Sequence, residues 1–301
     1  MITPPFLKAG DKVAIVSTAR KVSEDEMLPA VTLLNDWGLK VEFGKNLFKV
    51  LNQFAGTDEE RAADFQSALN DSSVNAILFA RGGYGTVRII DRIDWSGFQN
   101  NPKWLTGFSD VTVTHAHVHR HLGIETLHSP MAFNLAKSTS EVKNKMKAAL
   151  FGDKLSYEIG EHIPADMNRT GEASGELVGG NLSILYSLLG STSSIETAGK
   201  ILFLEDLDEY LYHIDRMMMA LKRAGKLYKL AGLIVGSMND MKDNKVRFNK
   251  TAEEIVSEAV SEYSYPVLYG FPAGHIRNNM PLIFGRKVKL KVGVDSSIIF
   301  E

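Results

Sequence analysis

The chain has 301 residues, with 34 lysines and arginines against 36 aspartates and glutamates, and it contains no cysteine. The length suggests two domains or one large one, and the balanced charge argues against partners such as nucleic acid or an anionic membrane. The lack of cysteine excludes disulfides, thiolate catalysis and cysteine-ligated zinc or iron–sulfur sites. No run of about 18 apolar residues predicts a membrane span, and prolines interrupt the N-terminal segment where a signal peptide would be apolar, so we expect a cytoplasmic protein.

The first half of the chain alternates between strand-like and helix-like patterns. Apolar and β-branched runs predict strands at residues 12–17, 39–43, 74–80 and 105–108. Helical spacing of apolar residues predicts helices at residues 24–37, 58–69 and 110–121. Strands that alternate with helices indicate an α/β fold, here a doubly wound and mainly parallel sheet in a domain of residues 1–150.

The pattern weakens at residues 151–172, which are rich in glycine, polar and charged side chains, and we predict a linker there. The remaining residues 173–301 are expected to form a C-terminal mixed α/β domain. Its predicted helices are at residues 181–189, 213–224 and 251–262. Its predicted strands are at residues 200–204, 231–236 and 266–269, and the alternating tail KVKLKVG is typical of an edge hairpin with one wet face.

A serine stands at the predicted turn between a strand and a helix, in the segment Thr106-Gly107-Phe108-Ser109-Asp110. A tight turn of this kind lifts a serine above the sheet, beside the backbone N–H groups of the helix N-terminus. Only the first glycine of the G-x-S-x-G elbow is present, because position 111 is valine. On this segment alone, an ordinary helix N-cap at Ser109 or Asp110 is the favoured interpretation.

A glycine cluster, Arg81-Gly82-Gly83-Tyr84-Gly85, directly follows the apolar strand at residues 74–80. It matches neither G-x-G-x-x-G nor the phosphate loop, so a nucleotide cradle is poorly supported. Glycines allow a ligand to approach backbone N–H groups closely, which suits a turn that binds an oxyanion. A plain connecting turn fits equally well.

Two further segments carry side chains of catalytic type. Glu205 and Asp206 end an apolar strand, at the sheet edge where open α/β folds hold ligands, although solvated loop carboxylates are the commoner case. His275 lies in a loop dense in glycine, proline and asparagine, residues 270–281. Histidine is the usual general base near neutral pH, and a simple backbone-bonded loop histidine is the alternative.

Four histidines alternate along a predicted helix, at positions 115, 117, 119 and 121. They form i,i+4 pairs on two different faces of the helix, and no third ligand or H-E-x-x-H motif accompanies them. Catalytic zinc sites usually have three protein ligands, and structural zinc sites usually have four. We therefore predict that the protein holds no metal.

Taken together, these segments make the chain resemble the LD-carboxypeptidase family of serine peptidases, also called muramoyltetrapeptide carboxypeptidases. The matching segments run through nearly the whole chain in family order: GDKVAIVSTA (10–19), FAGTDEERAADFQSALND (54–71), ARGGYGTVRIID (80–91), PKWLTGFSDVT (102–112), GELVGGNLSILYSLLGS (175–191), ILFLEDLDE (201–209) and GFPAGHIRNNMPLIFG (270–285). The sequence departs from the family at residues 127–130, where LHSP stands in place of an expected His-Gly-Pro. This difference affects a wall of the site and removes no catalytic group.

The resemblance implies a Ser–His–Glu triad, with Ser109 as nucleophile, His275 as base and Glu205 as acid, assembled between the two domains. It also implies an oxyanion hole formed by the backbone N–H groups of Gly83 and Asp110. No cofactor is implied. A homodimer is expected from the resemblance alone.

The implied activity is release of the terminal D-Ala of the murein tetrapeptide, from the L-centre of the third, diamino residue, during cell-wall recycling in the cytoplasm. The terminal carboxylate of this substrate needs a positive partner. Arg81 and Arg277 are our own candidates for that partner and are not family assignments.

Two other functions remain open. One is hydrolysis of peptide–nucleotide antibiotics of the microcin C type, which confers self-immunity, and the other is ligand binding without catalysis. The length of the chain favours wall recycling over the first, and the presence of all three triad candidates argues against the second. The sequence does not distinguish diaminopimelate from lysine at the third position of the substrate.

Overall fold

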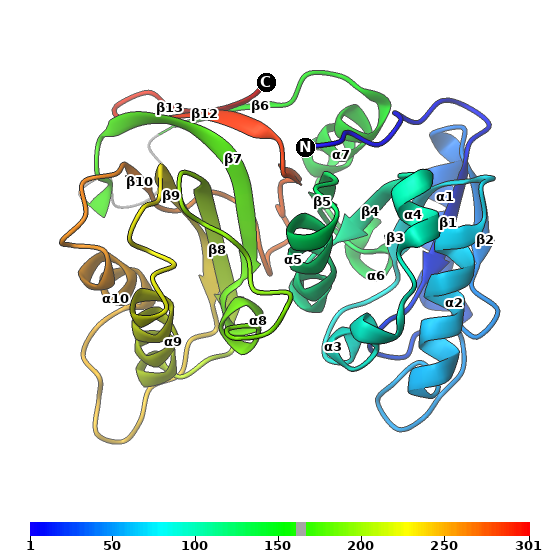
Figure 1. Ribbon diagram of the computed structural model, residues 1–301, viewed down its shortest axis with the longest axis horizontal. Helices are drawn as coiled ribbons and strands as arrows, with labels where there is room; N and C mark the ends of the chain where they lie inside the picture. Colours follow the sequence, from blue (N-terminus) through cyan, green and yellow to red (C-terminus); the bar gives the residue numbers. More distant parts are fainter. Residues whose placement is uncertain (161–166) are drawn as a thin grey trace.

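The computed structural model describes residues 1–160 and 167–301 and contains two sheets that lie side by side (Figure 1). The first sheet is ordered β11-β5-β4-β3-β1-β2, and every pairing in it is parallel except that of β11 with β5. Its strands are β1 (Lys12–Val16), β2 (Lys40–Phe43), β3 (Val74–Phe79), β4 (Trp104–Gly107), β5 (Thr126–His128) and β11 (Leu282–Phe284).

The first sheet is covered on both faces because its strands are apolar on both faces. Along β1, Val13 and Ile15 pack toward one face and Ala14 and Val16 toward the other. Residues of α1 and α7 cover the first of these faces, and residues of α2 and α5 cover the second. The helices are α1 (Glu24–Asp36), α2 (Asp58–Asn70), α3 (Thr86–Ile89), α4 (Ser96–Asn100), α5 (Thr112–His121), α6 (Ala132–Leu135) and α7 (Ser140–Phe151).

The second sheet is mixed and is ordered β10-β9-β8-β7-β12-β13-β6. Strands β7 to β10 are parallel, and the other pairings are antiparallel. Its strands are β6 (Ser156–Ile159), β7 (Gly171–Asn181), β8 (Ile201–Leu207), β9 (Gly232–Asn239), β10 (Val267–Leu268), β12 (Lys287–Val292) and β13 (Ser296–Phe300). The helices α8 (Leu182–Ser187), α9 (Leu211–Arg223) and α10 (Ala252–Ala259) pack on one face, and the other face joins the core of the first sheet.

The α/β fold class expected from the sequence is confirmed, and the arrangement differs from expectation in three places. The C-terminal hairpin of β12 and β13 has one solvent-exposed face, as expected. It does not form the edge of the sheet, because β6 pairs with β13 and is the edge strand. Strand β6 and the start of β7 lie within the predicted linker 151–172, of which residues 161–166 lie outside the described residues. Strand β11, from the predicted C-terminal domain, belongs to the first sheet.

Contacts between the two sheets are both apolar and polar. One continuous cluster of buried side chains includes Leu78 of β3 and Phe203 of β8. An ion pair of 2.6 Å joins Arg286 to Glu125, and both side chains are largely buried. Helix α5 lies between the sheets and contacts β7 and α8 (Figure 1). The relative position of the sheets is therefore fixed by close packing, and the residues at their junction are held with it.

Candidate active site

Ser109 lies in a strained turn that follows directly on β4. Phe108 is extended and Ser109 has φ of 62°, the left-handed region that non-glycine residues rarely adopt. A short 3₁₀ helix, Ser109–Val111, then leads into α5. Such strain costs on the order of 1–3 kcal/mol and is found mainly at functional sites. We call residues 107–111 the serine turn.

The N-cap interpretation of this turn is wrong. Neither the 3₁₀ helix nor α5 has a side-chain cap, and Asp110 is buried. The carboxylate of Asp110 instead accepts a hydrogen bond of 2.9 Å from the backbone N–H of Thr86, at the start of α3. Burial raises the pKa of Asp110, and the hydrogen bonds from Thr86 oppose that rise. Asp110 therefore connects the serine turn to the segment that follows the glycine cluster.

Three side chains from distant parts of the chain meet at the serine turn. The Nε2 atom of His275 lies 3.0 Å from Oγ of Ser109, and its Nδ1 atom lies 2.7 Å from Oε2 of Glu205. Glu205 is fully buried, and the side chain of His275 is 15% exposed. The interpretation of Glu205 as a solvated carboxylate is therefore wrong. The geometry allows a proton to pass from the serine hydroxyl to an imidazole that a buried carboxylate orients.

The charge state of His275 is set by opposing effects. Burial lowers its pKa, but the charge of Glu205, the hydrogen bond to it and the charge of Asp206 together raise the pKa above the usual value. A raised pKa makes the imidazole a stronger proton acceptor when it is neutral. The environment of His275 therefore suits a general base that becomes a stable imidazolium.

Asp206 is a second buried carboxylate beside Glu205. It accepts hydrogen bonds from Nδ2 of Asn181 (2.9 Å) and from the backbone N–H groups of Ser183 (2.8 Å) and Leu207 (2.9 Å). Burial, together with the charge of Glu205, raises the pKa of Asp206 to about 6. Asp206 is thus ionised at neutral pH and adds negative charge near His275.

The loop that carries His275, which we call the histidine loop (residues 270–281), is held by a buried asparagine. Oδ1 of Asn279 accepts a hydrogen bond of 2.8 Å from the N–H of Gly274 and lies 3.3 Å from Nε2 of His128 on β5. Burial lowers the pKa of His128 to about 3, so its ring is neutral and Nε2 is the nitrogen that donates to Asn279. This contact connects the histidine loop to the first sheet. His128 also pairs with Gly107 of β4, and Ser109 follows Gly107 by two residues.

Gly274 allows the histidine loop to approach Glu205. Its φ is +120°, and a Cβ atom at this position would lie 2.4 Å from Oγ of Ser237 and 2.8 Å from Oε2 of Glu205. A side chain here would therefore displace either the loop or the carboxylate. In the sequence, Gly274 and Asn279 are only two residues of a loop, and the fold alone shows what they contact.

One predicted oxyanion donor, Asp110, directly follows Ser109 in the chain, and the other, Gly83, belongs to the glycine cluster. A Cβ atom on Gly82 would lie 3.1 Å from Cβ of Ser109 and 3.2 Å from its Oγ, so the glycine cluster packs directly on the serine. For the backbone N–H groups of Gly83 and Asp110, the described part of the chain provides no acceptor. Both N–H groups remain able to donate to a substrate oxygen, and their assignment as the oxyanion hole stays a prediction.

The two arginine candidates differ in position. Arg277 lines a cavity of about 640 Å³ beside His275, which we call the reaction cavity. Its Nε donates to the carbonyl of Lys137 (2.9 Å), and no carboxylate in the described ranges pairs with it. Arg81 lies over the ring of Phe133 (4.0 Å) and 3.7 Å from Glu26. Arg277 is therefore the better placed of the two for an anionic ligand. The lining residues of the reaction cavity are Phe108, Asn134, Lys137, Ser138, Leu207, His275, Ile276 and Arg277.

The alternating histidines of α5 have structural contacts. Nε2 of His115 bonds to the carbonyl of Gly107 (2.9 Å), and Nδ1 of His117 lies 2.9 Å from Oγ of Ser193. Burial lowers the pKa of both rings to about 4, so both are neutral. In residues 1–160 and 167–301, no three His, Asp or Glu side chains gather as metal ligands would. Over the same ranges, no helix has both the length and the apolar character needed to cross a lipid bilayer.

Comparison with known proteins identifies a family for both halves of the chain. Residues 13–129 match the LD-carboxypeptidase N-terminal domain, and residues 174–290 match the LD-carboxypeptidase C-terminal domain. A probable murein peptide carboxypeptidase of Bacillus subtilis is 35% identical over 299 residues, which cover 98% of this chain and 93% of that protein.

Solved structures have the same fold. A muramoyltetrapeptide carboxypeptidase from Oxalobacter formigenes superposes with a TM-score of 0.86 at 25% identity, over 96% of this chain and 98% of that one. The microcin C7 self-immunity protein MccF, in complex with aspartyl sulfamoyl adenosine, superposes with a TM-score of 0.88 at 21% identity, over 100% and 98% of the two chains. At this identity the second likeness shows the fold alone.

Proposed function

Since the chain belongs to the LD-carboxypeptidase family, we propose that it is a serine-type carboxypeptidase that releases the terminal D-Ala from murein tetrapeptides. Family membership makes it a hydrolase, and relatives are named for murein peptides. The observation that carries the proposal is the contact of Ser109 with His275 and of His275 with Glu205. Cell-wall recycling is the process in which this reaction would serve.

In the proposed reaction, His275 takes the proton of the Ser109 hydroxyl while Oγ attacks the carbonyl carbon of the peptide bond. Nε2 of His275 is the atom that accepts this proton, because Nδ1 donates to Glu205. The imidazolium then gives the proton to the nitrogen of D-Ala, which leaves as the free amino acid. Water then attacks the carbonyl carbon of the acyl-enzyme while Nε2 of His275 takes a proton from the water. His275 gives this proton to Oγ of Ser109 as the bond between Oγ and the acyl carbon breaks, so the shortened peptide leaves as a free acid and Ser109 is restored.

The charge that develops in this reaction needs stabilisation at two points. Glu205 and Asp206 stabilise the imidazolium, in agreement with the raised pKa of His275. The N–H groups of Gly83 and Asp110 would stabilise the tetrahedral oxyanion, and loss of one such donor typically costs about 3 kcal/mol. The departure from the family at residues 127–130 includes none of the three proposed catalytic residues, Ser109, Glu205 and His275.

We assign the terminal carboxylate of the substrate to Arg277, with Arg81 as the weaker candidate. Arg277 lines the reaction cavity, whereas Arg81 already pairs with Glu26. Replacing Arg277 with Met should raise KM for a free-acid peptide far more than for the same peptide with a terminal amide. Equal effects of Arg277→Met on both peptides would reject the assignment, and Arg81→Met provides the matched comparison.

The test of the whole proposal is mass spectrometry of muropeptides incubated with the wild type and with Ser109→Ala. Loss of one D-Ala from the tetrapeptide with the wild type alone would support substrate, bond and nucleophile together. If the wild type leaves the tetrapeptide intact but still binds it, the function is ligand binding without catalysis.

The main alternative is hydrolysis of a peptide–nucleotide antibiotic of the microcin C type. It is supported by the likeness to MccF, which is 24% identical over 97% of this chain and 93% of its own length. Comparing D-Ala release from tetrapeptide with cleavage of an aminoacyl sulfamoyl adenosine separates the two.

The cytoplasmic location, the homodimer and the division into domains at residues 151–172 stay predictions.

A further inference from the structure

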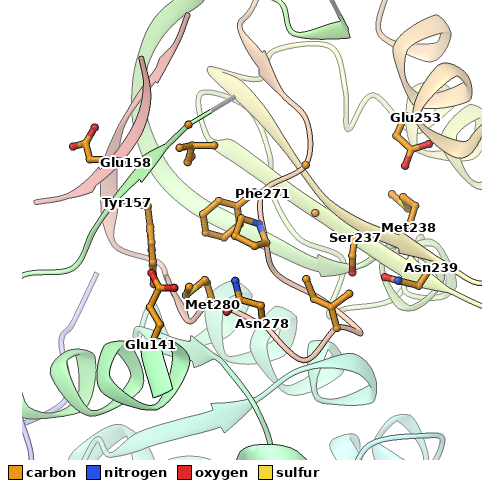
Figure 2. A pocket seen from close by; sticks show the side chains of 16 residues that line it. Glu141, Tyr157, Glu158, Ser237, Met238, Asn239, Glu253, Phe271, Asn278 and Met280 are labelled. Atoms are coloured by element: carbon orange, nitrogen blue, oxygen red, sulfur yellow. The ribbon is translucent and has the colours of Figure 1, made fainter. Parts of the chain in front are cut away.

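A cavity of about 580 Å³ lies beside the histidine loop (Figure 2). Figure 2 shows two of its carboxylates, Glu158 and Glu253, on opposite sides of the ring of Phe271, so the two form no common binding site. A more informative feature lies beside the first sheet. It is a buried arginine on α2, Arg61, which lines neither this cavity nor the reaction cavity.

The position of Arg61 on α2 does not by itself favour an arginine. The side chain is 1% exposed, and arginines are almost never fully buried unless they are paired. Arg61 is the fourth residue of α2, near the end where the helix dipole favours the acidic residues Asp58, Glu59 and Glu60 over a cation. Arg61 pairs with Asp58, but Asp58 already accepts hydrogen bonds of 2.7 to 3.1 Å from Arg88. The remaining contacts of Arg61 give a reason for an arginine here.

The guanidinium of Arg61 joins two segments of backbone. Its Nη1 donates to the carbonyl of Thr18, which follows β1 by two residues, and to the carbonyl of Gly85 at the end of the glycine cluster (3.2 Å). The carbonyl of Gly85 also accepts from the backbone N–H of Arg88 (3.0 Å). A second buried contact joins the same two segments, since Oγ1 of Thr18 lies 2.7 Å from Oγ1 of Thr86. Arg61 therefore holds the end of the glycine cluster against the loop that follows β1.

The peptide unit between Gly85 and Thr86 is held at both of its polar groups. Its C=O accepts from Arg61, and its N–H donates to the buried carboxylate of Asp110 (2.9 Å). The C=O and N–H of a trans peptide lie in one plane and point in opposite directions, so contacts to both groups fix the rotation of the unit. Asp110 directly follows Ser109 in the chain. Arg61 and Asp110 together therefore connect the orientation of the glycine cluster to that of the serine turn.

Gly83 lies between two fixed ends of the glycine cluster. At one end, a Cβ atom on Gly82 would lie 3.1 Å from Cβ of Ser109, and at the other end the peptide unit after Gly85 is held as described. Gly83 and Gly85 have φ of 110° and 153°, which glycine alone adopts readily. Because one residue separates these two glycines, a rotation of the peptide unit after Gly85 would shift the N–H of Gly83 relative to the N–H of Asp110. These are the two predicted oxyanion donors.

We propose that Arg61 and Asp110 are positioning residues, which hold the N–H groups of Gly83 and Asp110 at the separation that the tetrahedral oxyanion needs. The proposal rests on the proposed function. Both side chains are buried, so each acts through the peptide unit between Gly85 and Thr86 and not on the substrate. Because the oxyanion forms only after Ser109 attacks, loss of this positioning should lower kcat and leave KM nearly unchanged.

The first arm of the test measures D-Ala release at equal concentrations of folded enzyme. Asp110→Ala removes the acceptor of the Thr86 N–H and should lower kcat about 100-fold with KM within about 2-fold, since a displacement of about 1 Å can cost that much in rate. Asp110→Asn keeps an acceptor oxygen and should lower kcat no more than about 10-fold. Arg61→Met should lower kcat about 10-fold, because the N–H of Arg88 still binds the carbonyl of Gly85.

A tripeptide boronate, with the boronic acid in place of the scissile carbonyl, distinguishes positioning from a loss of stability. Its adduct with Ser109 is tetrahedral and places an oxygen where the oxyanion forms. In each variant its inhibition constant should rise by about the factor by which kcat/KM falls, whereas unfolding of part of the enzyme would leave the constant of the folded part unchanged.

Lys103→Met is the matched control for these variants. Lys103 is also buried, and its Nζ donates to the carbonyls of Ala68 (3.0 Å) and Asp71 (2.7 Å) at the C-terminal end of α2. We expect this variant to be less stable, because two buried carbonyls lose their donor. Its kcat and its inhibition constant for the boronate, measured on folded enzyme, should equal those of the wild type.

The second arm does not depend on catalysis and uses amide hydrogen exchange followed by mass spectrometry. Exchange over residues 82–86 should be about 10-fold faster or more in Asp110→Ala and in Arg61→Met than in the wild type, because the held peptide unit loses a partner. Exchange over the same residues should be unchanged in Lys103→Met.

Each outcome decides for or against the proposal. A loss of kcat with a matching rise in the inhibition constant and faster exchange supports it. If the boronate binds Asp110→Ala and Arg61→Met as tightly as the wild type, or if exchange is unchanged in both, the proposal is overturned. If the wild type releases no D-Ala, the proposed function fails, and the exchange measurement still decides: faster exchange in the two variants supports the positioning role, and unchanged exchange overturns it.

Discussion

The serine turn and the histidine loop bring their reactive atoms together by different physical means. The serine turn is mainly local: β4, a left-handed residue and a helix follow one another within a few residues, and this backbone conformation sets the direction of Ser109. The histidine loop has no regular structure around His275 and is held by side chains from elsewhere, above all by Asn279 and its partner His128. One half of the site therefore depends on local backbone conformation, and the other half depends on contacts between the sheets.

We expect the largest loss of activity when either side chain of the contact between Ser109 and His275 is removed. Ser109→Ala and His275→Ala should each lower the rate of D-Ala release on the order of a million-fold, because the groups act as a unit. The double variant should be no worse than either single variant. D-Ala release at high enzyme concentration measures this, and thermal unfolding serves as the control for folding. Additive effects would mean that the two side chains do not act in one step.

The next largest effect should come from the backbone of the histidine loop. Gly274→Ala places a methyl group against Ser237 and Glu205, so the loop or the carboxylate must move. A displacement of about 1 Å can cost roughly 100-fold in rate, and we expect a loss of that order in kcat. Gly293→Ala is the matched control, because the structure has nothing within 4 Å of a Cβ atom there. Equal activity of the two variants would show that the loop tolerates displacement.

A smaller effect tests whether contacts between the sheets hold the loop. Asn279→Ala removes the acceptor that binds both Gly274 and His128, and we expect kcat to fall about 10-fold with little change in KM. Combining it with His128→Gln gives a double-mutant cycle, in which the coupling should be about 1 kcal/mol. If the two substitutions add independently, the interaction between Asn279 and His128 does not position the base.

The smallest expected effect is on pH dependence. Asp206→Asn removes a negative charge that stabilises the imidazolium, so the pKa of His275 falls. Because only neutral imidazole accepts the proton of Ser109, the acid limb of kcat/KM should move to lower pH, by about half a pH unit. Asp208→Asn is the control, since that carboxylate is exposed and pairs with Lys242. A move of the acid limb to higher pH would contradict the electrostatic role given to Asp206.

The difference between local structure and long-range contacts also explains which features could be predicted from the sequence. The parallel strands of the first sheet and the helices between them follow from apolar runs and helical spacing, and β1, β3 and α2 lie within a few residues of their predicted bounds. The turn at Ser109 was identifiable because its pattern is local. The choice between a cap and a nucleophile was not, since it depends on where Asp110 bonds after folding.

Features that depend on long-range contacts could not be predicted from the sequence, for a physical reason. β7 contains four glycines, which weaken any strand signal, and it is stabilised by pairing with β8 and β12. Asp206 and Glu205 look solvated by composition, yet both are buried because β8 continues through them. The role of Asn279 depends on His128, 151 positions away. No pattern within one segment of sequence records such a partner.

The antiparallel pairing of β11 with β5 has a consequence for synthesis of the chain. The first sheet keeps an open edge at β5 until Leu282–Phe284 has been made. Because a ribosome adds roughly 5–20 residues per second, the edge at β5 stays unpaired for on the order of 10–30 s during synthesis. An unpaired strand edge invites association with other chains. A fragment that stops at residue 150 would keep this edge permanently and should aggregate, whereas the 301-residue chain covers the edge with its own β11.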